Sequence, residues 1–132
     1  DRYGLLISAI QPRPIAWVST VSRAGRTNLA PFSFFTGICS NPPSLLFCPV
    51  NHPDGREKDT LRNIRETREF VVNIVSESLA TVMNATSAEY GPEISEIEAI
   101  KIETLPSKVI KPPRVMASPV QMDCELIQVV DV

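Results

Sequence analysis

A single histidine limits the catalytic chemistry open to this chain. A Ser-His-Asp or Cys-His nucleophile would have to use His52. His52 directly precedes the turn-forming run Pro53-Asp54-Gly55, and in such a loop a solvated histidine is the commoner outcome. A zinc site is an alternative, but the spacings of its four candidate ligands are not those of known zinc motifs. These ligands would be Cys39, Cys48, His52 and Cys124, and cysteines within strands are expected to be core residues.

Neither the carboxylates nor any phosphate-binding loop adds a clear catalytic or nucleotide-binding candidate. No GxGxxG or GxxxxGK[ST] motif is present, so neither a Rossmann loop nor a Walker loop is available. Five glutamates considered as paired carboxylates are expected on solvated faces, where burial does not raise a carboxyl pKa. They are Glu66, Glu69, Glu93, Glu96 and Glu98. If the protein is an enzyme, a cofactor is expected to bring the reactive group.

One short segment suits an anionic ligand. Arg56 and Lys58 precede Thr60, which is expected to open a helix. Two cations, a hydroxyl and the free N–H groups of a helix start could converge there on a phosphate monoester. Taken alone, these residues favour the plainer interpretation, a capped helix with solvated neighbours.

Composition narrows the class of partner. The 132 residues carry 13 Lys and Arg against 15 Asp and Glu, a net charge of -2, which argues against binding to nucleic acid or to a membrane surface. No apolar run approaches the ~20 residues of a membrane span, and no signal peptide is recognised. Three cysteines without a CxxC pair suit reduced thiols, so a cytoplasmic location is expected.

The elements that must position these residues are mostly strands. Residues 15–21 and 28–38 are predicted to form a hairpin in which Pro31 marks an edge strand or a bulge. Further strands are expected at 44–50, 69–75 and 120–126, and helices after Asp59 and Ser76. Residues 94–100 have apolar residues at helical spacing. Strands outnumber helices without regular βαβ units, so the fold class is mainly β, an antiparallel barrel or sandwich with a few peripheral helices.

Together these segments resemble the flavin reductase-like, FMN-binding split-barrel family. Their order and spacing over nearly the whole chain carry the resemblance. The matching segments are 13–20 (RPIAWVST), 28–35 (NLAPFSFF), 41–44 (NPPS), 58–60 (KDT) with Asn63-Ile64, 69–73 (EFVVN), and 118–120 (SPV) leading to 124–126 (CEL).

The resemblance implies a Greek-key split β-barrel that binds FMN, or sometimes FAD, at or near a homodimer interface. Residues 1–132 would be a single such domain, without the further C-terminal strands of many members. Ser33, Phe34 and Phe35 would lie near the flavin ring, with Asn28 in the same segment and Ser19 and Thr20 on the neighbouring strand. Lys58 and Thr60 would hold the phosphate, assisted by Arg13 or Arg56.

The activity implied is that of an oxidoreductase moving hydride from NAD(P)H to flavin, with no catalytic side chain assigned. A partner oxygenase is a candidate acceptor of the electrons from the reduced flavin. Two alternatives stay open: a non-catalytic FMN-binding electron carrier or flavin store, and a split-barrel enzyme that oxidises a pyridoxamine phosphate. The segments 28–35 and 42–43 fit the reductase-like branch better.

Overall fold

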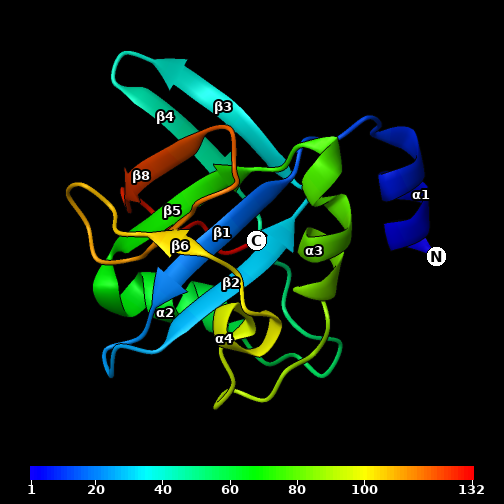
Figure 1. The fold of residues 1–132 in the computed structure, drawn as a ribbon. Coiled ribbons are helices and arrows are strands. Elements are labelled where there is room, and N and C mark those ends of the chain that lie inside the picture. Colours follow the sequence, from blue (N-terminus) through cyan, green and yellow to red (C-terminus); the bar gives the residue numbers. More distant parts are fainter.

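A four-stranded antiparallel sheet lies at the centre of the molecule (Figure 1). The computed structural model describes residues 1–132. The strands follow the order β2 (Thr27–Phe32), β1 (Ala16–Val21), β5 (Glu69–Ile74) and β8 (Gln121–Glu125). Thr20 pairs with Asn28, and Val18 pairs with both Ala30 and Val72. The β-branched and aromatic residues of β1 and β5 suit these two central strands, which are covered on both faces.

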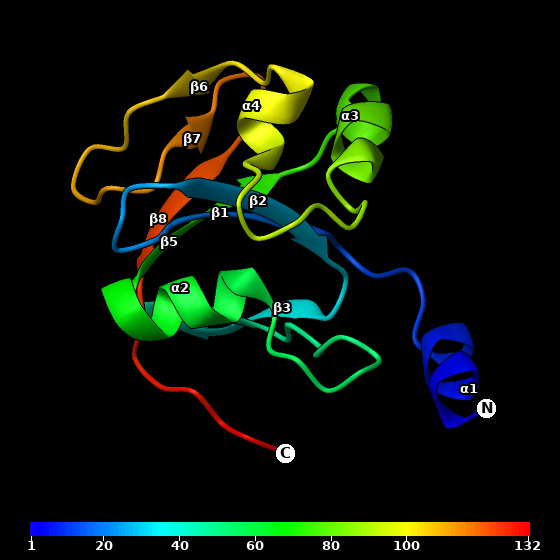
Figure 2. The same cartoon turned by 90° about the horizontal axis from the view of Figure 1, so that it is seen from below.

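Helix α2 (Asp59–Thr67) and the hairpin of β3 (Phe35–Ser40) and β4 (Pro43–Phe47) lie on one side of the sheet (Figure 2). Ile64 of α2 is buried there against Val18 and Val72. The Phe47 ring packs 5.2 Å from Phe32 and 5.5 Å from Phe70, measured between ring centroids. The hydrophobic contacts of α2 fix this helix across strand β1.

The opposite face of the sheet carries the elements that lie between β5 and β8 in the sequence (Figure 2). They are the 3-10 turn η1 (Glu77–Leu79), α3 (Ala80–Ala85), α4 (Glu96–Ile100) and the short pair β6 (Thr104–Leu105) and β7 (Arg114–Val115). Their core contains Trp17, Leu29, Ile97 and Val115. Trp17 Nε1 donates a hydrogen bond of 2.9 Å to Thr86 Oγ1, so the buried indole N–H is satisfied.

Two elements project from this body. Helix α1 (Arg2–Ala9) has no buried residue and lies to one side, and the β3–β4 hairpin extends beyond the sheet (Figure 1). Both therefore expose apolar side chains, among them Leu5, Leu6, Ile38 and Leu46. None of the helices is long and apolar enough to cross a membrane.

The mainly β prediction is confirmed, and the strands predicted at 15–21, 44–50, 69–75 and 120–126 each overlap an observed strand. The predicted strand 28–38 is two strands, because β2 ends at Phe32 and β3 begins at Phe35. Pro31 pairs in regular register with Trp17, so the edge-strand prediction is right and the predicted bulge is wrong. An irregularity of register lies instead in the β3–β4 pair, between Gly37 and Cys39.

The strands form three separate sheets, none of which is closed into a barrel.

The expectation that all three cysteines are core residues is also wrong. Cys39 and Cys48 are exposed because the β3–β4 hairpin and the residues after it are not covered. Only Cys124 packs against the core, and burial raises the pKa of its thiol to about 11. An unreactive, protonated thiol follows from that shift.

The side chain of Asn73 ties the sheet to the elements on its α4 face. Asn73 is fully buried in β5. Its Nδ2 donates to the Trp17 carbonyl at 3.0 Å, and its Oδ1 accepts the Val115 N–H at 2.8 Å. One amide therefore joins β1, β5 and β7.

We expect Asn73→Ala to lower the free energy of unfolding by about 1–3 kcal/mol, because it leaves the buried Val115 N–H without a partner. Denaturant unfolding followed by the fluorescence of Trp17, the single tryptophan, measures this loss. The exposed Asn84→Ala is the matched control and should stay within about 0.5 kcal/mol of the wild type. Equal stability of the two variants would contradict the role given to Asn73.

Candidate functional site

A tight polar turn leads the chain into α2. The Gly55 N–H donates to the His52 carbonyl at 2.8 Å, and the His52 N–H donates to the Arg56 carbonyl at 2.9 Å. Gly55 has φ +85°, a left-handed conformation that glycine adopts without a steric cost. The turn ends at Lys58, the N-cap residue of α2, whose backbone is extended.

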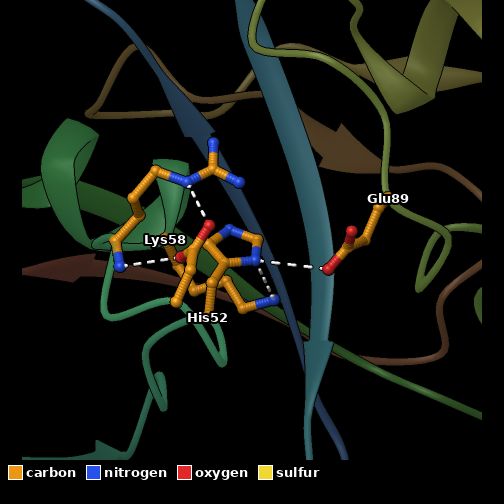
Figure 3. Close-up of polar contacts among 5 residues, drawn as sticks. His52, Lys58 and Glu89 are labelled. Carbon is orange, nitrogen blue, oxygen red and sulfur yellow. Dashed lines mark hydrogen bonds and ion pairs between the residues drawn. The ribbon is translucent and has the colours of Figure 1, made fainter.

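Lys58 places a cation at the positive end of a helix. Its side chain is half-buried, and its Nζ lies 3.4 Å from His52 Nδ1 (Figure 3). Lys58 forms no ion pair, and no side chain caps the first turn of α2. A half-buried ammonium without a carboxylate partner, beside the N–H groups of a helix start, is suited to binding an anion.

The side chains of Arg56 and Thr60, which were predicted to join Lys58 at a phosphate, point away from the Lys58 ammonium. The Arg56 side chain is 73% exposed and its Nε lies 2.6 Å from Asp54 Oδ2, within the turn. This pairing lowers the pKa of Asp54, first through the Arg56 backbone N–H and then through the guanidinium. Thr60 is 2% exposed and directs its hydroxyl toward Asn28. The structure therefore does not bring Arg56, Lys58 and Thr60 to one point.

Four buried polar side chains join the first turns of α2 to β1 and β2. Thr60 Oγ1 and the Asn28 amide lie 2.9 Å apart, and Asn63 Nδ2 donates to Thr20 Oγ1 at 3.1 Å. Asn63 Oδ1 is buried without a partner. A cavity of about 30 Å³, lined in part by Asn28, Asp59 and Asn63, has room for one water molecule that could satisfy it. This layer fixes the start of α2 against β2.

Glu96 completes this layer from the other side of β2, and its prediction as a solvated residue is wrong. The residue is 8% exposed, and its Oε2 accepts the Leu29 N–H at 3.1 Å. With the Asn28 nitrogen oriented toward Glu96 Oε1, at 3.3 Å, the Asn28 oxygen accepts the Thr60 hydroxyl at 2.9 Å. Glu96 is buried because α4, to which it belongs, packs along the free edge of β2. Burial raises the pKa of the Glu96 carboxyl.

A second group of predicted residues lies after the other end of β2. Arg13 Nε donates to Ser33 Oγ at 3.3 Å, and its guanidinium carbon lies 5.8 Å from the centroid of the Phe34 ring. The same guanidinium donates to the Ile7 carbonyl at 2.6 Å, which ties the segment to α1. Phe35 begins β3 and packs against the core under the sheet. Arg13, Ser33 and Phe34 thus form one half-buried cluster.

Ser19 lies apart from both groups. Consecutive strand residues face opposite sides, so Ser19 points away from Thr20. Its hydroxyl donates to the Pro113 carbonyl at 2.5 Å and accepts from Asn73 at 3.3 Å. Its cofactor role stays a prediction, and the structure gives the hydroxyl two internal partners.

Sequence reasoning missed several residues of the site. Asn63 could have been found, since it follows Thr60 by three residues and so shares its helix face. His52 is not the solvated residue that its turn suggested: its side chain is 21% exposed and contacts Lys58 and Glu89. The contacts of His52 with Glu89 and of Leu29 with Glu96 join segments that are far apart in the sequence. No local sequence pattern therefore predicts them. No group of three or more His, Cys, Asp or Glu side chains is arranged to hold a metal ion.

The chain belongs to the family described as flavin reductase like domain, whose model matches residues 9–132. This confirms the resemblance inferred from the segments above.

Solved structures with the same fold agree with this assignment. The nitrilotriacetate monooxygenase component B of Bacillus cereus is 40% identical with a TM-score of 0.92, and the match covers 97% of this chain and 63% of that one. The 2-nitrobenzoate 2-nitroreductase NbaA of Pseudomonas fluorescens is 36% identical with a TM-score of 0.88, covering 98% and 61%. A Shewanella frigidimarina protein described as a 'putative flavin reductase with split barrel domain' is 26% identical with a TM-score of 0.78, covering 88% and 56%. The chain thus spans less than two thirds of each of these proteins.

We expect Glu96→Gln to change how stability depends on pH. A carboxyl whose pKa is raised on folding contributes stability that is complete below its unfolded value, about 4.3, and is lost as the pH rises through the folded value. The variant lacks this loss, so its melting temperature should rise relative to the wild type as the pH increases above about 4. Thermal unfolding between pH 4 and pH 8 measures the difference.

The exposed Glu93→Gln serves as the control, and its melting curve should run parallel to that of the wild type. A difference between Glu96→Gln and wild type that does not vary with pH would show that Glu96 is not a buried, titrating carboxyl.

Proposed function

We propose that this chain is the FMN-binding part of a flavin-dependent oxidoreductase that takes hydride from NAD(P)H. The observation that carries the proposal is the half-buried Lys58 ammonium, free of any ion pair, at the uncapped start of α2 in a member of the flavin reductase-like family. This donor set suits the phosphate of FMN.

The residues present fit the two ends of such a cofactor. Lys58 and the first-turn N–H groups of α2 would hold the phosphate, with Thr60 and Asn28 fixing the helix start. Arg56 is exposed and could leave Asp54 to assist. The flavin ring would lie against residues 33–35, where Arg13 orients Ser33 and Phe34. Asn28 and Phe32 are four residues apart in β2, about 13 Å, so the two groups suit an elongated ligand.

Bound flavin would supply the redox chemistry, accepting a hydride from the nicotinamide and passing the electrons on. The chain's own residues need only bind and orient the flavin and exclude water, because hydride transfer to flavin needs no strong acid or base from the protein. FMN is favoured over FAD because Lys58 and one helix start match a single phosphate group.

The remaining features of the proposal concern the whole protein. Component B of nitrilotriacetate monooxygenase is named as part of an oxygenase system, which supports a partner oxygenase as the electron acceptor here. The exposed apolar residues of α1 and of the β3–β4 hairpin support a homodimer. We further propose a single domain over residues 1–132 and a cytoplasmic location, in keeping with its three free cysteines.

Lys58→Ala should weaken FMN binding by about 1–3 kcal/mol, because one charge-assisted hydrogen bond to the phosphate is lost. Its affinity for riboflavin, which has no phosphate, should not change. Titrations followed by flavin fluorescence measure both affinities. The exposed Lys108→Ala is the matched control and should bind FMN as the wild type does. Equal FMN affinities of the two variants would move the phosphate site away from α2.

Turnover separates a reductase from an electron carrier. With FMN bound and oxygen excluded, NADH or NADPH should bleach the flavin absorbance band near 450 nm (roughly the ordinary position for oxidised flavins). A protein that holds FMN but is never bleached by either nucleotide would be the electron carrier or flavin store instead.

A further inference from the structure

The ring of His52 lies between a cation and a carboxylate that both approach the same nitrogen (Figure 3). Lys58 Nζ is 3.4 Å from His52 Nδ1, and Glu89 Oε1 is also 3.4 Å from His52 Nδ1. His52 and Lys58 belong to the segment before α2, whereas Glu89 belongs to the segment between α3 and α4. The imidazole thus bridges two segments far apart in sequence.

These two contacts exclude each other as hydrogen bonds. A lysine ammonium only donates and an ionised carboxylate only accepts. With a proton on Nδ1, His52 donates to Glu89 and has no acceptor for Lys58. Without that proton, Nδ1 accepts from Lys58 and cannot donate to Glu89. His52 therefore has two alternative partners, and the proton on Nδ1 selects between them.

We propose that His52 is a positioning residue that couples the binding of a phosphate group at Lys58 to the docking of residues 87–90 through Glu89. The proposal rests on the proposed function. A phosphate group draws the Lys58 ammonium away from Nδ1, which then takes a proton from solvent and donates to Glu89. The Nδ1–H bond is the one covalent bond that forms, its proton comes from solvent, and Nε2 keeps its own proton, so the net change is one proton bound.

The surroundings of His52 leave Glu89 as the carboxylate that this switch engages. Asp54, in the same turn, is paired with Arg56 at 2.6 Å, and Asp59 is paired with Arg62 at 2.5 Å. Glu89 is 74% exposed, and its one ion-pair contact is the one with His52.

The later part of the same segment is fixed independently of His52. Glu93 lies 3.0 Å from Arg26, and Ser95 Oγ lies 2.7 Å from Thr27 Oγ1. Thr86, at the start of the segment, is also fixed independently, because it is 2% exposed and its Oγ1 accepts the Trp17 Nε1–H at 2.9 Å. The His52–Glu89 contact therefore acts on residues 87–90, rather than on the whole segment, beside the start of α2.

The single histidine makes the test direct. The imidazole resonances of His52 are followed by NMR between pH 5 and pH 8, without ligand, with riboflavin and with FMN. We expect FMN to move the midpoint of this titration to higher pH by about half a pH unit or more, and riboflavin to leave it unchanged. Hydrogen exchange of residues 87–90 should slow when FMN binds.

Two variants separate the coupling from a direct effect of the phosphate charge. In Glu89→Gln the shift of the midpoint should shrink to less than half and the slower exchange should be lost, whereas a variant of the exposed Glu98, Glu98→Gln, should retain both. A full shift in Glu89→Gln, or a midpoint unmoved by FMN, would overturn the coupling.

Flavin fluorescence in the same samples reports whether FMN binds. Bound FMN with an unmoved His52 titration would overturn this inference alone. Absence of FMN binding would overturn the proposed function, and this inference with it.

Discussion

The packing of α2 across β1 and β2 is the constraint on which the candidate site depends. Ile64 provides the apolar contact with the sheet, and the layer of Thr20, Asn28, Thr60 and Asn63 provides the polar one. Buried polar groups must find partners, so this layer allows few positions of the helix relative to β2. The helix start, and with it Lys58, is held in place by residues that need not touch a ligand themselves.

The residues that position the start of α2 are thus different from those that would contact a ligand, which explains why so few side chains look catalytic. The groups that contact the proposed ligand would be backbone N–H groups, one ammonium and an aromatic segment, while the buried carboxyl group of Glu96 accepts a hydrogen bond from the free edge of β2 behind them. A site of this kind binds and orients a reactive group rather than supplying one. The 2-nitrobenzoate nitroreductase and the monooxygenase component B, which differ in their named chemistry, share this fold at 36% and 40% identity with the chain.

Local patterns in the sequence predicted the elements that local forces determine. The alternation in 120–126, the β-branched run in 15–21 and the helix start near Asp59 were right, because period and turn chemistry act over a few residues. The break at Ser33, the exposure of Cys39 and the burial of Glu96 were not predicted, since each depends on which segments pack together in three dimensions. The expected convergence of Arg56, Lys58 and Thr60 failed for the same reason. Their side chains have three different partners, and the sequence around them does not reveal which.

A crystal structure of the chain with FMN tests the central claim most directly. Our account predicts that the phosphate lies within hydrogen-bond distance of Lys58 Nζ and of N–H groups in the first turn of α2, with the flavin ring beside residues 33–35. A phosphate bound at any other surface, with Lys58 still directed at His52, would contradict it.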